Sequence, residues 1–330
     1  MDLRWGLVGL GQVAEDYLAQ AFAACRNGRL VACAGRTLER AEQFATAHGV
    51  DRAYPSYVEL FRDPGVDAVF VAAPNHLHHA IVLAAANAGK HVLCEKPMAL
   101  TTGEAEEMIA ACRASGVTLR IGFQGRFHPS LAAAREIVRA GSLGEIREAS
   151  VQRYVRIKIL KWRNNLAEAG AGVLNDVAVH GIDFLQWILE DSIARVFAIA
   201  RPPRSSGHTD DFVALTMEFV GGGVATLRCS RLLAYGANDV QIFGTRGMLV
   251  TSSLLRAAEK YPLVVTTEKG TERREFPAGD LYLAEIEAFA DAVDGQATPA
   301  CTGEEGLYLV RVSEAVVRSL ETGAIQSVEV

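Results

Sequence analysis

The sequence predicts an α/β protein in two parts: a doubly wound parallel sheet, followed by an α+β domain with an open, largely antiparallel sheet. Two observations lead to this prediction. Up to residue 122, short apolar runs alternate with segments of helical periodicity, which is typical of crossovers between parallel strands. After residue 195, strand-like runs follow one another across glycine turns, which is typical of hairpins. We therefore expect domains at 1–122 and 123–330.

Composition limits the class of protein. The chain has 330 residues, half of them hydrophobic, and a formal net charge of -6 from 33 basic and 39 acidic residues. No basic patch stands out, which argues against a nucleic-acid partner. The six cysteines are scattered and form no Cys-x-x-Cys pair or zinc pattern, which favours a reducing compartment. No apolar run is long enough for a membrane span, and the first strand starts too early for a signal peptide, so we expect a cytoplasmic protein.

The first strand and its turn form the main candidate for nucleotide binding. An apolar run leads into Gly9-x-Gly11-x-x-Ala14, and a helical pattern starts at once. In a Rossmann βαβ unit, Gly9 would allow the tight turn, Gly11 would let the backbone approach a pyrophosphate, and Ala14 would let helix and strand pack closely. The N–H groups of the helix start, at Gln12 and Val13, favour an anion. Glycine-rich turns are common, so an ordinary strand–turn–helix is the alternative.

The second strand, expected over 29–34, ends where a dinucleotide fold holds the adenosine ribose. Enzymes that use NAD place an acidic residue there to bind the 2′-hydroxyl. This sequence has Gly35-Arg36-Thr37 instead, with Arg40 one turn later. Because arginine and hydroxyl side chains hold a 2′-phosphate, the sequence favours NADP over NAD. Alternatively, Arg36 stacks on the adenine, an arrangement that admits either cofactor.

The rest of the first domain continues the alternation. Helices are expected over 15–25, 38–48, 79–88 and up to 114, the last capped by Thr101 or Thr102, and Ser56 is an expected N-cap of a further helix. Strands are expected over 66–72, 91–94 and 117–122. Ligands of parallel sheets bind beyond the carboxyl ends of the strands. The residues expected near the nicotinamide ribose are therefore those at two strand tips: Pro74, Asn75, His78 and Glu95.

The second domain contains the predicted antiparallel sheet. Strands are expected over 145–155, 196–200, 211–219, 223–229, 239–244, 247–251 and 262–267, and helices over 130–140, 173–189, 282–293 and 306–322. Such a sheet packs one face on helices of its own chain, and a second subunit often covers the other face. We therefore expect a homodimer or homotetramer formed through this sheet.

Three residues are candidates for the chemistry. Lys96 follows a strand tip, and Asp176 and His180 lie four apart on one expected helix, so that they share a face. Hydride transfer to or from an alcohol carbon also needs a group that exchanges the hydroxyl proton. His180 suits this because the usual pKa of histidine lies near neutrality, and a lysine can do it when burial and a nearby cation lower its pKa. The plain alternatives are a solvated Lys96 and a surface Asp176–His180 pair.

Two further clusters carry less weight. Three histidines share one turn, but no carboxylate or thiol is spaced to complete a ligand set, so no metal site is expected; they are His76, His78 and His79. A basic loop either contacts substrate or is simply solvated; it contains Lys158, Lys161 and Arg163.

Taken in order, these motifs resemble a known family. The matching segments are Gly9-x-Gly11-x-x-Ala14, Pro74-Asn75-His76-Leu77-His78, the run from Gly89-Lys90-His91 to Glu95-Lys96-Pro97, the run from Gly122 to Pro129, and Asp176-Val177-Ala178-Val179-His180. The chain resembles the glucose–fructose oxidoreductase, inositol dehydrogenase and rhizopine-catabolism (Gfo/Idh/MocA) oxidoreductases over nearly its whole length. The resemblance implies an NAD(P)-dependent oxidoreductase that acts on a sugar or polyol, as a dehydrogenase or a keto-sugar reductase.

The resemblance also implies roles for particular residues. In this family the lysine of Glu-Lys-Pro and both ends of Asp-x-x-x-His line the active site, with the histidine commonly the acid/base; these are Lys96, Asp176 and His180. The chain is similar to the 1,5-anhydrofructose reductase branch, which has a Trp-Arg pair before the glycine-rich entry, here Trp162-Arg163. The expected substrate-binding residues are Arg126, Trp162 and Arg163. One departure is Gly170-Ala171-Gly172, where the family usually has three glycines.

Two other functional classes remain as alternatives. One is a glycosidase that uses tightly bound NAD to oxidise a sugar transiently, which resembles a branch of the same superfamily. The other is a cofactor-binding sensor without chemistry. The joint presence of Lys96, Asp176 and His180 argues against a sensor, because a sensor needs no proton shuttle.

Overall fold

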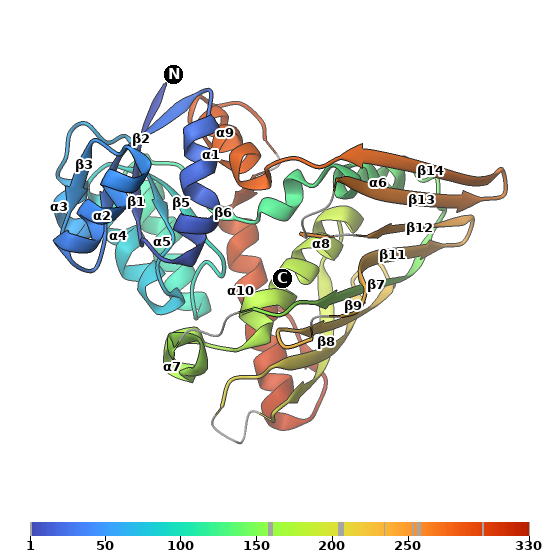
Figure 1. Ribbon diagram of the computed structural model, residues 1–330. Helices are drawn as coiled ribbons and strands as arrows, with labels where there is room; N and C mark the ends of the chain where they lie inside the picture. The colour runs from blue at the N-terminus through green and yellow to red at the C-terminus, as the bar shows by residue number, and fades with distance from the viewer. Residues whose placement is uncertain are drawn as a thin grey trace. The chain divides into compact units, whose positions relative to one another are not determined.

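The computed structural model describes residues 2–157, 161–203, 208–233, 235–252, 254–255, 259–298 and 300–329. The chain divides into two compact units. Unit 1 comprises Met1–Gln124 and Asp280–Val310, and unit 2 comprises Gly125–Gly279 and Arg311–Val330. A parallel sheet with helices and a second, largely antiparallel sheet are both present, so the predicted fold class is confirmed (Figure 1).

Unit 1 is organised on a parallel sheet with the order β15-β6-β5-β4-β1-β2-β3. Its strands are β1 (Leu3–Val8), β2 (Gly28–Ala34), β3 (Arg52–Tyr54), β4 (Ala68–Val71), β5 (His91–Glu95), β6 (Leu119–Gly122) and β15 (Cys301–Thr302). Only β15 pairs antiparallel in this sheet. Strand β1 lies between β2 and β4, so the order reverses on its two sides. The turn after β1 therefore sits at the topological switch point, where such sheets bind ligands.

The helices of unit 1 follow the predicted alternation. They are η1 (Ala14–Leu18), α1 (Ala19–Ala24), α2 (Leu38–His48), α3 (Tyr57–Phe61), η2 (Asn75–Leu77), α4 (His78–Asn87), α5 (Thr102–Ala114), α9 (Leu281–Val293) and the first part of α10 (Gly303–Thr322). Two predicted caps are confirmed. The Ser56 side chain accepts a hydrogen bond from the N–H of Glu59, and Thr101 forms a capping box with Glu104.

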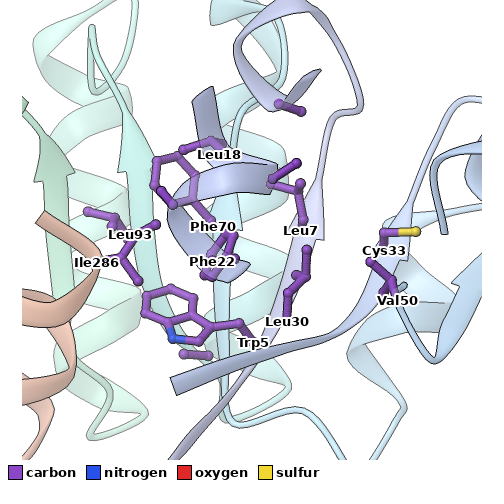
Figure 2. Packing of buried hydrophobic residues seen from close by; sticks show 14 of the residues in the cluster. Trp5, Leu7, Leu18, Phe22, Leu30, Cys33, Val50, Phe70, Leu93 and Ile286 are labelled. Carbon is purple, nitrogen blue, oxygen red and sulfur yellow. The ribbon is translucent and has the colours of Figure 1, made fainter. Parts of the chain in front are cut away.

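The return of the chain into unit 1 was not expected from the sequence, which assigns residues 123–330 to one domain. Helix α9 lies against α1 and is drawn in orange beside the blue helix in Figure 1. Its Phe289 ring packs 4.9 Å from the Trp5 ring, and Ile286 lies in the same buried cluster, which Figure 2 shows with Phe22. Burial of large apolar side chains against β1 is the physical reason that 280–310 belongs to unit 1.

Unit 2 is organised on a sheet with the order β14-β13-β12-β11-β7-β10-β9-β8-β16. Its strands are β7 (Ile146–Tyr154), β8 (Ile193–Arg201), β9 (Phe212–Phe219), β10 (Val224–Ser230), β11 (Asn238–Gly244), β12 (Gly247–Ser252), β13 (Lys260–Thr267), β14 (Gly270–Pro277) and β16 (Gln326–Ser327). Strands β7 and β10 pair in parallel, and the other pairs are antiparallel. The sequence analysis missed β14, because this exposed strand is rich in charged residues and lacks the apolar alternation of a half-buried strand.

Helices cover one face of this sheet. The helices of unit 2 are η3 (Gln124–Phe127), α6 (Pro129–Arg139), η4 (Lys161–Asn164), α7 (Leu166–Ala169), η5 (Leu174–Ala178), α8 (Val179–Leu189) and the last part of α10. Helix α8 packs on β7, and α6 packs on β12, β13 and β14. A Cβ atom at Gly181 would lie 2.6 Å from a methyl group of Leu227, so the absence of a side chain there lets α8 approach the sheet closely.

Two properties of the described residues bear on the predicted class. No helix among them is long and apolar enough to cross a membrane. The six cysteines are free thiols, and all except Cys25 are buried. Burial raises the pKa of Cys33 and Cys112 to about 11, so these thiols stay neutral and act as packing groups.

His78 ties together the loops that follow β4 and β5. Its side chain is 1% exposed. Its Nδ1 atom lies 2.8 Å from the carbonyl oxygen of Pro97, and its Nε2 atom lies 2.9 Å from that of Ala73. A neutral imidazole has one N–H, so it donates to one of these oxygens and turns its other nitrogen to the second. Burial lowers the pKa of His78 and outweighs the opposite effect of the two carbonyls.

Replacement of His78 by alanine should lower the free energy of unfolding by about 1–3 kcal/mol, because one backbone carbonyl in the interior loses its hydrogen-bond donor. The pKa of His78 in the folded protein lies below its usual 6.5, so the unfolded chain binds more protons in the intervening range. The wild-type protein should therefore lose stability as the pH falls below about 6.5, and the variant should lose less. Urea denaturation at two pH values measures both effects.

His79→Ala is the matched control. This neighbouring histidine pairs with Glu107 at the surface, so its removal should change stability by less than about 0.5 kcal/mol. Equal pH dependence in the wild type and in His78→Ala would contradict the assignment.

Candidate functional site

The glycine turn after β1 has the geometry that a bound nucleotide requires. Gly9 has a φ of +95°, and a Cβ atom there would lie 2.5 Å from the carbonyl oxygen of Ala72, so only glycine fits. A Cβ atom at Gly11 would meet no atom within 4 Å. The protein itself therefore leaves open space at Gly11, which fits the approach of a phosphate group to the backbone. Ala14 is fully buried, as the close packing of helix and strand requires.

The helix after this turn occupies residues 12–24, and Gln12 and Val13 form its first turn. Their N–H groups therefore lie at the positive end of the helix, where a pyrophosphate is stabilised. The segment Ala14–Leu18 is a π-helix, in which the N–H of Ala19 bonds to the carbonyl of Ala14. Such segments recur at functional sites.

The structure changes the interpretation of the second strand tip. Arg40 donates from Nη2 to Oε1 of Glu15 at 2.5 Å and to the carbonyl of Leu10 at 3.0 Å. The other oxygen of Glu15 lies 2.8 Å from Nε2 of His48. The charge of Arg40 is therefore offset by a carboxylate that lies 25 residues away in the sequence. This guanidinium links the glycine turn to α2 through Nη2, while its side chain remains 42% exposed.

The other two residues predicted at this tip, Thr37 and Arg36, differ in whether their side chains are available to bind a 2′-phosphate. The hydroxyl of Thr37 accepts a hydrogen bond from the N–H of Arg40 and is the N-cap of α2. Arg36 is exposed. Of the side chains predicted to hold a 2′-phosphate, Arg36 is thus the one whose charge is turned to solvent. The sequence analysis missed Glu15, because nothing in its local pattern marks it as a partner of Arg40.

The tips of β4 and β5 carry the residues predicted near the nicotinamide. Pro74 and Asn75 begin the short helix η2, and Asn75 is buried. Glu95 is buried, and its carboxylate accepts a hydrogen bond from the N–H of Lys96 at 3.2 Å. Both ring nitrogens of His78 face backbone carbonyls, so they are engaged within the protein, and a cofactor contact of His78 stays a prediction. His78 instead holds the loop that follows Lys96.

Tyr282 is a residue of unit 1 that the sequence analysis missed as a site candidate. Its hydroxyl accepts a hydrogen bond from Nε2 of Gln124 at 3.0 Å, and its ring stacks on Tyr17 at 5.3 Å. Burial, followed by the charge of Glu95, raises the pKa of Tyr282 well above its usual value, so the hydroxyl keeps its proton. The local pattern around Tyr282 does not indicate a site, because the sequence predicts its helix in the second domain, whereas the structure places it in unit 1.

In unit 2, Asp176 and His180 lie on one continuous helical stretch, as predicted, but its geometry differs from a regular α-helix. Asp176 lies in the π-helix η5, where the N–H of Val179 bonds to the carbonyl of Leu174. His180 lies in the first turn of α8 and is 5% exposed. The simple four-residue rule for side chains that share a helix face therefore does not apply here.

The entry to this helix explains the departure from three glycines. Gly170 has a φ of +74°, which favours glycine. A Cβ atom at Gly172 would lie 2.0 Å from the carbonyl oxygen of Asp210, so no other residue fits there. Ala171, between them, is buried and meets neither restriction. The alanine is therefore compatible with the loop geometry.

Two arginines face the carboxylate of Asp176. Nη1 of Arg231 lies 3.0 Å from its Oδ2 atom, and Nη1 of Arg163 lies 3.4 Å from its Oδ1 atom. The guanidinium of Arg163 also lies over the Trp162 ring, 5.1 Å from its centroid. The fold thus brings the predicted Arg163 to Asp176, with Trp162 against its guanidinium, and it adds Arg231, which the sequence analysis missed. Of the remaining basic loop, Lys158 lies outside the described residues.

Arg126 has a different environment from the one predicted. It is 3% exposed and donates from Nε at 3.0 Å and from Nη2 at 2.7 Å to Oδ1 of Asp183, whose side chain is fully buried. This ion pair joins η3 to α8. The geometry favours a positioning role for Arg126 over direct contact with substrate.

The described part of the chain shows no set of side chains that could bind a metal ion. Within it, no group of three or more histidine, cysteine, aspartate or glutamate side chains could hold a metal ion. The groups available for chemistry are a lysine that follows the tip of β5 in unit 1, and a carboxylate with a histidine in unit 2. Proton exchange and hydrogen bonding to hydroxyl groups are the reactions these groups support.

Two family models match successive parts of the chain. The oxidoreductase family with an NAD-binding Rossmann fold matches residues 3–123, and the GFO/IDH/MocA C-terminal domain matches residues 131–250. The 1,5-anhydro-D-fructose reductase of Ensifer adhaerens is 31% identical over 329 residues, which cover 99% of this chain and 98% of that protein. The trans-1,2-dihydrobenzene-1,2-diol dehydrogenase of Mus musculus is 33% identical over 279 residues, covering 84% and 80% of the two chains.

Solved structures extend the likeness to the whole fold. The aldose–aldose oxidoreductase from Caulobacter crescentus, solved in complex with glycerol, has a TM-score of 0.90 and 28% identity, with 99% of this chain and 100% of that chain covered. Since both parts of the chain match and its relatives extend over its full length, this protein belongs to the Gfo/Idh/MocA family of NAD(P)-dependent oxidoreductases.

Proposed function

We propose that this enzyme transfers a hydride between a nicotinamide cofactor and a sugar or polyol, and so interconverts a hydroxyl and a carbonyl group. The observation that carries the proposal is Asp176 with two arginines at its carboxylate, followed by His180, in a chain with an NAD-binding turn. A carboxylate beside a guanidinium suits a hydroxyl, which both donates and accepts hydrogen bonds. The names of the relatives at 31% and 28% identity, an anhydrofructose reductase and an aldose–aldose oxidoreductase, support this substrate class.

Each candidate residue has a distinct role in the proposed reaction. The nicotinamide, when bound, supplies or accepts the hydride. In oxidation the substrate carbon loses a hydride and its hydroxyl loses a proton, which His180 takes on a ring nitrogen. The ammonium group of Lys96 donates a hydrogen bond to the reacting oxygen and stabilises its developing negative charge. Asp176 accepts a hydrogen bond from another hydroxyl of the substrate and so orients the sugar or polyol. In reduction each transfer runs in reverse.

Replacement of His180 by asparagine tests the proton-transfer role. The variant should lose about 10²- to 10⁴-fold in kcat/KM, because it retains a polar side chain but cannot exchange a proton. The dissociation constant of NADPH should not change. Turnover is measured from NADPH absorbance with 1,5-anhydro-D-fructose and with a panel of aldoses and polyols.

The control is His79→Asn, which alters a surface histidine of unit 1 that pairs with Glu107. Full turnover by His180→Asn would refute the acid/base assignment. Cofactor that stays bound through purification, without net reduction by any substrate, would instead favour the NAD-dependent glycosidase reading.

We also infer a preference for NADP over NAD, which rests on Arg36. This side chain is exposed just before the N-terminus of α2, where a 2′-phosphate would meet both its charge and the helix dipole. Glu15 acts in the opposite sense, because it holds Arg40 and adds negative charge nearby. The preference is therefore set by the balance between Arg36 and Glu15.

Fluorescence titration with NADPH and NADH tests this balance. Arg36→Ala should weaken NADPH binding about 10-fold or more and leave NADH binding nearly unchanged, because a charge-assisted hydrogen bond is worth about 1.5–3 kcal/mol. Glu15→Gln should strengthen NADPH binding relative to NADH. Arg62→Ala, at an exposed position after α3, controls for net charge. An equal loss for both cofactors in Arg36→Ala would mean that this side chain stacks on the adenine.

The open face of the sheet in unit 2 supports the expected homo-oligomer. Residues that alternate with the buried ones remain accessible there, and Ile199 on β8 is 48% exposed. Its cross-strand neighbour Ala214 is partly exposed as well. A second copy that covers this face would bury the apolar side chains among its polar ones.

Light scattering after gel filtration tests this proposal. The wild-type chain should elute with the mass of a dimer or tetramer, and Ile199→Arg should shift it toward the monomer, since a buried unpaired charge opposes association. Tyr57→Arg, on α3 of unit 1, is the control. A monomeric wild-type protein at micromolar concentration would contradict the proposal.

A further inference from the structure

Arg231 is a buried arginine that follows strand β10. Its side chain is 1% exposed, yet its guanidinium meets four oxygen atoms from three separate segments. Nη1 donates to Oδ2 of Asp176 at 3.0 Å and to the carbonyl of Arg163 at 3.4 Å. Nε donates to Oδ1 of Asp211 at 2.9 Å, and Nη2 donates to Oγ1 of Thr209 at 2.8 Å. A charge is unfavourable in such a place unless it is paired, so the surrounding groups form a site built around this side chain.

The segment that holds Arg231 also fixes the start of the Asp176 helix. Asp210 lies between Thr209 and Asp211 and is buried. Its two carboxylate oxygens accept hydrogen bonds from the N–H groups of Gly172 at 2.9 Å and Leu174 at 3.1 Å. Three consecutive residues thus bind this region: Asp210 binds the backbone that precedes Asp176, and Thr209 and Asp211 bind the guanidinium that faces its side chain. Backbone and side chain of Asp176 are positioned by the same segment.

The two arginines at Asp176 differ in how firmly they are held. Arg163 has a side chain that is 23% exposed, and it lies at the longer distance of 3.4 Å from Oδ1. Arg231 is almost completely buried and uses all three of its guanidinium nitrogens. Its planar fork is therefore the rigid contact that sets the direction of the carboxylate.

We propose that Arg231 is a positioning residue of the active site, which orients Asp176 toward a substrate hydroxyl that does not react. That hydroxyl donates to the Asp176 carboxylate and accepts from the Arg163 guanidinium, so the substrate carries at least one hydroxyl besides the one oxidised. Arg231 itself does not touch the substrate. This inference rests on the proposed function, because it requires Asp176 to bind a sugar or polyol.

A double-mutant cycle on kcat/KM tests the inference. Arg231→Gln and Asp176→Asn should each lower kcat/KM about 100-fold, because misplacement of an orienting group by about 1 Å costs that much. The double variant should be no worse than the poorer single variant, since both changes remove one contact. Multiplicative losses would overturn the proposal and leave Arg231 with a purely structural role. An unchanged kcat/KM in Asp176→Asn would instead refute the role of Asp176 in the proposed function.

Further variants keep the test decisive if Arg231→Gln folds poorly. Arg231→Lys keeps the charge but loses the planar fork, so it should recover the melting temperature and still show a lowered kcat/KM. Thr209→Val removes one acceptor and should give a smaller loss of the same kind. Arg147→Gln changes an arginine that is 65% exposed and should have no effect. Wild-type kcat/KM in both Arg231→Lys and Thr209→Val would overturn the proposal.

NADPH titration of each variant distinguishes an effect on cofactor binding from an effect on the orientation of Asp176. The dissociation constant should stay within about twofold of the wild type in Arg231→Gln, because the glycine turn lies in unit 1. A loss of NADPH binding that matches the loss of kcat/KM would show that the change acts on the cofactor and would overturn the positioning role.

Discussion

The contact of Gly9 with the carbonyl of Ala72 is the constraint on which the chemistry of unit 1 depends. No side chain fits at Gly9, and the backbone there takes a φ that favours glycine. The chain can therefore turn sharply at the end of β1, between its neighbours β2 and β4, and begin a helix at once. The features that would hold the pyrophosphate follow from this turn: the N–H groups of the helix start and the open space at Gly11.

In unit 2 a glycine also lies against a backbone carbonyl just before the helix that carries the candidate residues. Gly172 approaches the carbonyl of Asp210 even more closely than Gly9 approaches that of Ala72, because a Cβ atom would lie 2.0 Å from the first oxygen and 2.5 Å from the second; a helix again begins directly afterwards. Both helices open with a π-helical segment, Ala14–Leu18 in one unit and Leu174–Ala178 in the other. A π-segment widens the helix locally and occurs often where a site must accommodate a ligand. In each unit some of the candidate residues thus lie on a helix start that a glycine contact has fixed: Gln12 and Val13 in unit 1, and Asp176 in unit 2.

Charge pairing across the sequence decides which cations remain available for ligands. Arg40 pairs with Glu15 and Arg126 pairs with Asp183, while Arg231 joins Asp176 to Asp211. Buried or half-buried cations of this kind stabilise the fold only with their partners in place, and they hold those partners in one orientation. Arg40 and Arg126, which suggested ligand contacts in the linear sequence, are thus also engaged in ion pairs within the fold. Arg36 is exposed, and Arg163 keeps partial exposure of its side chain beside Asp176.

The sequence by itself determined the features that depend on local pattern. Helix α2 begins and ends at the predicted residues because Thr37 caps one end and Gly49 closes the other, and the glycine turn was evident from its spacing. Only the tertiary structure decided the rest. It joined residues 280–310 to unit 1 through the packing of Phe289 on Trp5, paired Arg231 with Asp176, and placed His78 between two carbonyls. The physical reason is that each of these contacts joins segments distant in the chain, where burial and charge pairing decide the outcome and leave no trace in local periodicity.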